Sequence, residues 1–134
     1  MLFRSRPGMA KVFDSSAVLA FLFEEPGGEK TIPDLPVGLM SAVNAAEVLG
    51  VLVRKGMSLE EARLALRKTR LKIVDFSMDC AAKTAELLVG GISLGDRACM
   101  ATALLMGLPA VTADRNWAGL RVPHLRIEYI RGVN

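Results

Sequence analysis

Residues 93–117 read SLGDRACMATALLMGLPAVTADRNW, a mostly apolar stretch with an aspartate near each end, Asp96 and Asp114. The spacing of good helix formers predicts a helix over residues 96–106, which a Gly-Leu-Pro sequence ends. Residues 110–113 are short, apolar and partly β-branched, as in a buried strand. The helix carries the chain about 15 Å in one direction, and the strand carries it roughly 13–16 Å back. Asp96 and Asp114 are therefore expected at the same edge of the fold.

Strands alternate with helices along the rest of the chain. Propensity and turn residues predict strands at residues 11–13, 37–40, 71–76 and 126–130, and helices at residues 16–23, 42–53, 59–70 and 78–89. Ser41 and Ser77 stand at helix N-cap positions, and Ser58 forms a capping box with Glu61. This alternation predicts an α/β domain in which helices cover both faces of a parallel sheet of about five strands. A ligand site is expected beyond the carboxyl ends of those strands.

Composition indicates one globular domain of 134 residues, with 51% hydrophobic residues and few aromatics. The 17 Lys and Arg residues against 14 Asp and Glu residues are compatible with a polyanionic partner, without identifying one. Cys80 and Cys99 stand outside any metal-binding spacing, which favours core positions in a protein of the reducing cytoplasm. The longest uncharged run, residues 98–113, is too short to span a membrane. The acids on both sides of residues 17–23 exclude a signal peptide there.

Acidic residues mark the expected ligand edge. Asp14 follows the first strand, and Asp114 follows the strand after the long helix, so both lie where parallel strands end. Each acid also has an ordinary structural explanation. Asp14 and Asp96 suit helix N-caps, and Asp114 suits a turn. Glu47 shares a helical face with Asn44, which by default is a solvated stripe. The combination of acids, rather than any single one, favours a shared site.

Convergence of these acids would require a cation. Two carboxylates about 4 Å apart repel by about 4 kcal/mol at an effective dielectric of 20. Three or four would raise their pKa values or bind a metal, and an all-oxygen set suits Mg²⁺ or Mn²⁺. Such an ion can activate a water that attacks phosphorus. Other chemistries have less support, because His124 is the only histidine and the chain has no glycine-rich phosphate-binding motif.

Four segments, in this order and spacing, resemble one known family. They are VFDSSAVL at 12–19, SAVNAAEV at 41–48, SLGDRA at 93–98 and VTADRNW at 111–117. Together they are similar to the PIN domain, and specifically to the VapC-type toxin ribonucleases of bacterial and archaeal toxin–antitoxin pairs. The resemblance covers about residues 10–130.

The resemblance implies a three-layer α/β/α sandwich and metal-dependent cleavage of single-stranded or loop RNA. It assigns Mg²⁺, with Mn²⁺ as a substitute, to four acids: Asp14, Glu47, Asp96 and Asp114. Ser16 and Thr112 match small hydroxyl positions that would hydrogen-bond these carboxylates, and Asn44 matches a polar position one turn before Glu47. Arg97 and Arg115, which stand beside two of the acids, are expected to contact RNA phosphates. The resemblance also implies a cognate antitoxin and a homodimer.

The chain departs from the family pattern in three places. Trp117 stands where Phe is usual, and residues 24–40 are short and Pro-rich, so a helix often used for antitoxin binding is expected to be reduced. Residues 1–8 precede the usual start as a flexible extension of the single domain 1–134, and Met9 is an alternative initiator. Two alternative classes have less support. A receiver-like signalling domain needs adjacent acids after the first strand, which this chain does not have. A non-catalytic PIN relative would be expected to have lost some of the acids.

Overall fold

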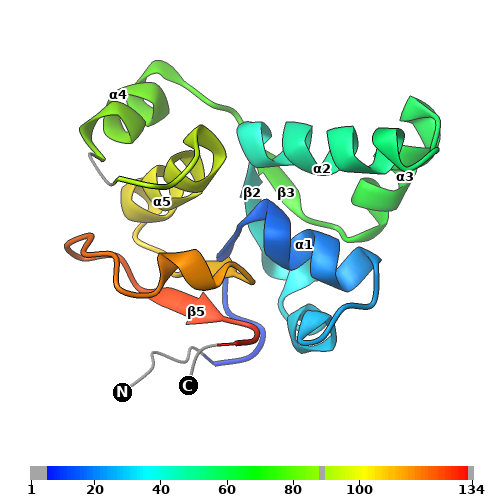
Figure 1. Ribbon diagram of the computed structural model, residues 1–134, viewed down its shortest axis with the longest axis horizontal. Coiled ribbons are helices and arrows are strands. Elements are labelled where there is room, and N and C mark those ends of the chain that lie inside the picture. The colour runs from blue at the N-terminus through cyan, green and yellow to red at the C-terminus, as the bar shows by residue number, and fades with distance from the viewer. Residues whose placement is uncertain (1–5, 88–89, 133–134) are drawn as a thin grey trace.

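The computed structural model describes residues 6–87 and 90–132, and a five-stranded parallel sheet runs through it (Figure 1). The strands are β1 (Val12–Phe13), β2 (Leu39–Ser41), β3 (Lys72–Val74), β4 (Ala110–Thr112) and β5 (Ile127–Tyr129). Their order is β3-β2-β1-β4-β5, and every neighbouring pair is parallel. The chain winds outward from β1 through β2 and β3 and then returns to the other side of β1. The topological switch point therefore lies between β1 and β4, as in other doubly wound sheets.

Helices cover both faces of the sheet. They are α1 (Ser15–Leu22), α2 (Ala42–Arg54), α3 (Leu59–Lys68), α4 (Met78–Glu86) and α5 (Leu94–Met106). Successive strand residues point to opposite faces. Phe13 packs in a core with residues of α1, α2 and α3, while Val12 packs in a second core with α5 and Trp117. The predicted three-layer α/β/α architecture is confirmed.

Serine caps fix several helix starts as the sequence predicts. Ser41 accepts a hydrogen bond from the Val43 amide, and Ser77 accepts one from the Cys80 amide. Ser58 and Glu61 form both bonds of the capping box. The pattern of hydroxyl residues before apolar periodicity therefore located these starts correctly.

Some boundaries differ from the predicted ones. The long helix α5 begins at Leu94 rather than at residue 96, because Ser93 is its N-cap. Helix α3 ends at Lys68 rather than at residue 70, since Arg70 has a left-handed φ of 66°. The helix predicted to reach residue 89 ends at Glu86, and residues 88–89 lie outside the described residues.

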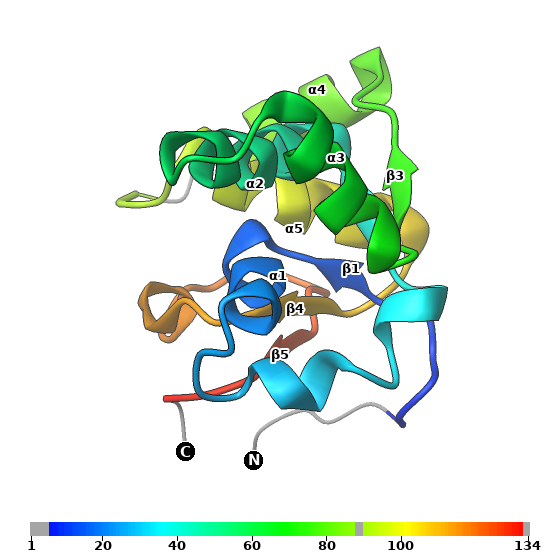
Figure 2. The ribbon, with the colours of Figure 1, turned by 90° about the vertical axis from the view of Figure 1, so that its right-hand side faces the viewer.

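The Pro-rich segment between α1 and β2 forms two short 3₁₀ helices, η1 (Gly28–Thr31) and η2 (Leu35–Val37). Figure 2 shows this segment on the same side of the molecule as β5. No α-helix forms within it, in agreement with the expected reduction of this region. Among the described residues, no helix combines the length and the apolarity needed to cross a membrane.

A buried ion-pair network holds the start of β1. The Lys11 side chain is 1% exposed, and its Nζ lies 2.6 Å from Asp34 Oδ2 and 3.1 Å from Glu128 Oε2. Asp34 precedes η2 and Glu128 lies in β5, so the network joins three segments that are distant in sequence. It anchors β1 at the end opposite Asp14.

Replacing Lys11→Met is expected to lower the free energy of unfolding by about 3–5 kcal/mol, because the buried Asp34 carboxylate would lose its cation. Urea denaturation measures the change. Lys83→Met is the matched control, since the exposed Lys83–Glu86 pair should contribute less than about 1 kcal/mol. Equal losses in the two variants would contradict this assignment.

Candidate active site

Two neighbouring strands end at the switch point, and each brings a polar residue there. Asp14 follows β1 directly, and Thr112 is the last residue of β4. Phe13 pairs with Val111, and the Asp14 amide donates to the Val111 carbonyl at 2.8 Å. This pairing fixes Asp14 beside Thr112, with the Asp14 residue only 1% exposed.

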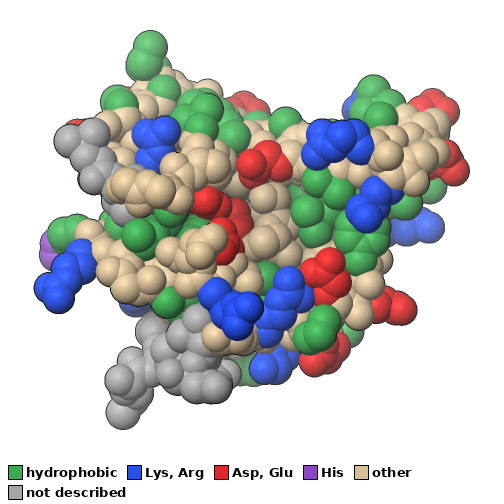
Figure 3. Space-filling view, in the orientation of Figure 1, with side chains coloured by type: hydrophobic (Ala, Val, Ile, Leu, Met, Phe, Trp, Pro, Cys, Tyr) green, Lys and Arg blue, Asp and Glu red, His purple; other side chains and the backbone are tan. Residues whose placement is uncertain are grey.

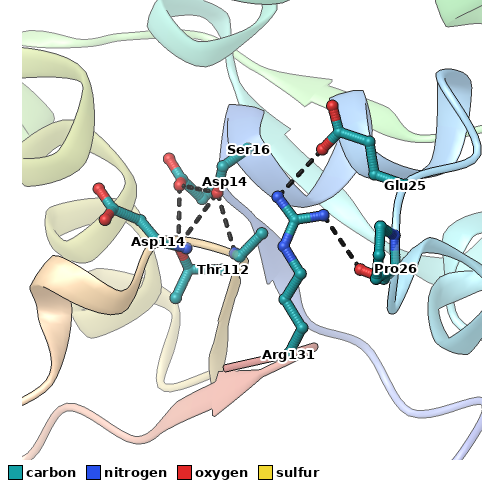
Figure 4. Close-up of polar contacts among 8 residues, drawn as sticks. Asp14, Ser16, Glu25, Pro26, Thr112, Asp114 and Arg131 are labelled. Carbon is teal, nitrogen blue, oxygen red and sulfur yellow. Dashed lines mark hydrogen bonds and ion pairs between the residues drawn. The ribbon is translucent and has the colours of Figure 1, made fainter. Parts of the chain in front are cut away.

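Neutral donors surround one oxygen of Asp14. Ser16 Oγ donates to Asp14 Oδ2 at 2.6 Å, and Thr112 Oγ1 donates to the same oxygen at 2.9 Å. Backbone amides in turn donate to both hydroxyls, that of Ala113 to Ser16 and that of Asp114 to Thr112 (Figure 4). The other oxygen, Asp14 Oδ1, is buried and has no hydrogen-bond partner among the described residues. The predicted hydroxyl support of Asp14 is thus present in the structure.

The environment of Asp14 raises its pKa from 3.8 to about 7. Burial is the largest cause, because it disfavours the charged carboxylate. The negative charges of Asp96 and Glu47 raise the pKa further, while the hydrogen bonds from Ser16 and Thr112 lower it. The charges of Glu47 and Asp96, which lie far from Asp14 in sequence, therefore act on Asp14 in the fold.

Glu47 reaches this site from α2. Its Oε1 accepts hydrogen bonds from Ser15 Oγ at 2.8 Å and from Asn44 Nδ2 at 3.0 Å. Asn44 is fully buried and also donates to the Gly95 carbonyl at 3.0 Å, which links α2 to the first turn of α5. The face shared by Asn44 and Glu47 is therefore turned toward α5 rather than being a solvated stripe.

Asp96 belongs to the first turn of α5 and takes part in its cap. Ser93 N donates to Asp96 Oδ2 at 3.2 Å, and Asp96 N donates to Ser93 Oγ at 3.1 Å. Cys99 lies one turn further along and is fully buried. Its pKa is raised well above 9.0 by burial first and then by the charges of Asp14, Asp96 and Glu47. Figure 3 shows acidic side chains gathered at the centre of the molecular face, between α5 and α1.

The Asp114 carboxylate caps a short helix next to the Asp14 site. Its Oδ1 accepts from the Asn116 amide at 2.8 Å and caps the short 3₁₀ helix η3 (Arg115–Trp117). Its charge helps to raise the pKa of Tyr129, after the larger effect of burial, whereas the charges that raise the pKa of Asp14 come from Asp96 and Glu47. The structure thus places Asp114 at the predicted edge, with one oxygen of its carboxylate capping η3. Its part in a shared site stays a prediction.

The two predicted phosphate-binding arginines lie beside the acids in the chain and differ in exposure. Arg97 follows Asp96 in α5 and is half-buried, while Arg115 is exposed in η3. The Arg115 side chain passes over Gly132, where an added Cβ would lie 2.5 Å from its Cδ. These positions do not test RNA binding by Arg97 or Arg115, which stays a prediction.

Sequence reasoning missed three residues that shape the site. Ser15 donates to Glu47, Ser93 caps α5 through Asp96, and Gly95 lies against the Glu47 carboxylate. Only Ser93 had a usable signal, because Ser-x-x-Asp before an apolar helix is a capping-box pattern. The roles of Ser15 and Gly95 depend on contacts with α2, which local sequence does not reveal.

The donors around Asp14 meet some of the requirements of a metal ion. Within residues 6–87 and 90–132, no group of three or more His, Cys, Asp or Glu side chains is assembled so that it could hold an ion. Two features nevertheless fit a hard cation: the buried Asp14 Oδ1 lacks a partner within those residues, and the nearby donors are carboxylate oxygens. Mg²⁺ is commonly bound by one or two carboxylates together with waters, so a preassembled cage is not required.

The fold and the acidic cluster define a doubly wound α/β domain with its candidate site at the topological switch point. The family model of the PIN domain matches residues 11–122, and the chain belongs to the PIN domain family. No curated protein sequence matches the chain.

Solved structures share this fold at low sequence identity. A toxin–antitoxin complex from Klebsiella pneumoniae contains a chain with a TM-score of 0.72 and 22% identity, with coverage of 92% of this chain and 99% of that one. For VapBC2 from Rickettsia felis, bound to a promoter DNA fragment, the TM-score is 0.70 and the sequence identity is 21%, with coverage of 90% of this chain and 98% of that one. For DNA-bound VapBC from Salmonella typhimurium, the TM-score is 0.68 and the sequence identity is 21%, with coverage of 92% of this chain and 100% of that one.

The raised pKa of Asp14 predicts how stability depends on pH in the metal-free protein. Because the folded-state pKa of about 7 exceeds the unfolded value near 3.8, protonation stabilises the fold, and this contribution is lost as pH rises to 7 and beyond. Asp14→Asn removes the titration. The free energy of unfolding of Asp14→Asn relative to the unmodified protein should therefore increase by about 2–3 kcal/mol between pH 5 and pH 8.

Urea denaturation in EDTA at both pH values measures this difference. Asp79→Asn, at an exposed position of α4, is the control and should show no such pH dependence. A difference for Asp14→Asn that stays constant with pH would mean that Asp14 is not the titrating group.

Proposed function

We propose that this PIN domain is a divalent-metal-dependent endoribonuclease and the toxin of a toxin–antitoxin pair. The observation that carries the proposal is the buried Asp14 carboxylate, which has an oxygen unpartnered among the described residues and is acted on by the charges of Glu47 and Asp96. Burying one acid near two others is unfavourable in an apo protein, and a cation would relieve it. Family membership supports nuclease chemistry at this position.

Asp14, Glu47 and Asp96 are the residues that would hold Mg²⁺ or Mn²⁺, directly or through waters, with Asp114 as the predicted fourth acid. When bound, such an ion makes a coordinated water more acidic and stabilises negative charge on phosphate oxygens. Ser16 and Thr112 keep Asp14 Oδ2 occupied and thereby fix the direction of Oδ1. Arg97 and Arg115 would hold RNA phosphates beside the acids, which makes binding salt-dependent.

A cognate antitoxin is the proposed protein partner. The toxin–antitoxin complex from Klebsiella pneumoniae and the VapBC structures share this fold over nearly the whole chain, which supports a similar pairing here. We also propose a homodimer and a cytoplasmic location, where an RNA substrate is available.

Asp14→Asn and Asp96→Asn should each reduce RNA cleavage by more than about a hundredfold, since loss even of groups that only support metal ligands costs roughly 10- to 100-fold. The side-chain amide introduced by Asp96→Asn can still accept the hydrogen bond from the Ser93 amide, so the α5 cap should survive. Cleavage of a labelled single-stranded RNA in Mg²⁺ and in EDTA measures the effect, with circular dichroism as the folding check and Asp79→Asn as the control.

Undiminished cleavage in either variant would refute these assignments. RNA binding by the unmodified protein without Mg²⁺-dependent cleavage would instead support a non-catalytic RNA-binding PIN domain.

Induced expression in a bacterial host should arrest growth, and Asp14→Asn should not arrest it. Co-expression of a small DNA-binding protein encoded next to this gene should restore growth. Colony counts after induction measure both effects, with protein levels compared by immunoblot. Normal growth in the presence of soluble, RNA-cleaving protein would argue against the toxin role while leaving the nuclease intact.

A further inference from the structure

The Glu47 carboxylate is held in place by residues from three different helices. Ser15 begins α1, Asn44 lies one turn before Glu47 in α2, and Gly95 is the second residue of α5. We propose that Ser15 and Gly95, together with Asn44, are positioning residues that set the orientation of Glu47 for a divalent cation. This inference rests on the proposed metal-dependent function.

The hydrogen bonds distinguish the two oxygens of Glu47. Ser15 Oγ and Asn44 Nδ2 both donate to Oε1, at 2.8 and 3.0 Å. Neither donor carries a charge, so the negative charge of Glu47 is retained. Oε2 has no hydrogen bond within the described part of the chain. The arrangement therefore occupies one oxygen and leaves the other for a ligand.

Ser15 couples Glu47 to Asp14 through the chain itself. It is the residue immediately after Asp14, and Ser16, the next residue, donates to Asp14 Oδ2. Two successive hydroxyls at the start of α1 thus serve two different carboxylates. A shift of this turn would move the supports of both acids together.

Gly95 determines how closely Glu47 can approach α5. A Cβ added at Gly95 would lie 2.2 Å from Glu47 Oε2 and 2.5 Å from both Cδ and Oε1. These distances are far below van der Waals contact, so any side chain at position 95 would displace the carboxylate. Because the displaced group is the end of a flexible side chain, the helix itself need not move. Glycine at this position therefore permits the observed orientation of Glu47.

Asn44 completes the arrangement by joining α2 to α5. Its Nδ2 donates both to Glu47 Oε1 and to the Gly95 carbonyl at 3.0 Å. The same residue thus fixes the carboxylate and the backbone against which it lies. Asn44 Oδ1 is buried and has no hydrogen-bond partner within the described residues.

Gly95→Ala is the decisive variant, because it should separate folding from metal binding. Alanine is the better residue within a helix, so the thermal midpoint should be unchanged or higher. The affinity for Mn²⁺ should nevertheless fall at least about tenfold, the scale expected when the support of a ligand is lost. Mn²⁺ alone is the probe, titrated calorimetrically and followed by the electron paramagnetic resonance signal of the free ion.

Gly50→Ala is the matched control. Gly50 lies within α2, and an added Cβ would meet only the Arg54 side chain, at 3.3 Å. It should reproduce the change in thermal midpoint without changing Mn²⁺ affinity. Gly95→Ala with Mn²⁺ affinity within about twofold of the unmodified protein would overturn the proposed positioning role, since lost ligand support costs roughly tenfold or more.

Ser15→Ala and Ser15→Thr provide an independent comparison. Alanine removes one donor to Oε1 and should weaken Mn²⁺ binding several-fold, while threonine keeps the hydroxyl and should restore it. Equal affinities in all three proteins would exclude a role for Ser15. If the unmodified protein binds no Mn²⁺, the proposed metal-dependent function fails and this inference fails with it. Tight binding by the unmodified protein and by Gly95→Ala alike would overturn the inference alone.

Discussion

Asp14 is a buried acid at the end of a buried strand, and no Lys or Arg among the described residues forms an ion pair with it. Its neighbours are hydroxyl groups, which lower its pKa only partly against the effect of burial. Removing a carboxylate from water without a compensating charge is costly, and the two further acids nearby add repulsion. The structure around the switch point must therefore offset the free-energy cost of burying the Asp14 carboxylate in its ionised form.

The rest of β1 and its surroundings supply that support. β1 itself has two residues, Val12 and Phe13, each in a different hydrophobic core. The strand is flanked by a buried cation and a buried anion that do not pair with each other. Lys11 is neutralised by Asp34 and Glu128, whereas Asp14 has no such partner among the described residues. The hydrophobic packing of Val12 and Phe13 thus offsets the cost of burying Asp14 directly after them.

Local sequence patterns predicted much of this fold, but they predicted the candidate site only in part. Periodicity and serine caps located α2, α3 and α5 to within a few residues, because those signals act over one or two helical turns. Element lengths placed Asp96 and Asp114 at one edge correctly, yet they gave only the level along the strands and not the direction of the carboxylates. For that reason the hydrogen bond that Asp114 Oδ1 accepts from the Asn116 amide was not predicted. The burial of Lys11 was not predicted, because its partners lie 23 and 117 residues away.

The four candidate acids share one arrangement, in which one carboxylate oxygen is hydrogen-bonded and the other is not. Asp14 Oδ2, Glu47 Oε1, Asp96 Oδ2 and Asp114 Oδ1 each accept from a hydroxyl, amide or backbone donor. The second oxygen of each has no hydrogen bond within residues 6–87 and 90–132. None of the ion pairs in the described residues includes any of the four. Neutral donors fix the direction of a carboxylate and leave its charge uncompensated, whereas a lysine or arginine would have satisfied it. For Asp96 and Asp114, which take part in helix caps, a cap and a metal ligand are therefore not competing explanations, because one oxygen can serve each purpose. Asp14 makes no side-chain cap, although the sequence would allow one, and its bonded oxygen accepts from Ser16 and Thr112 instead.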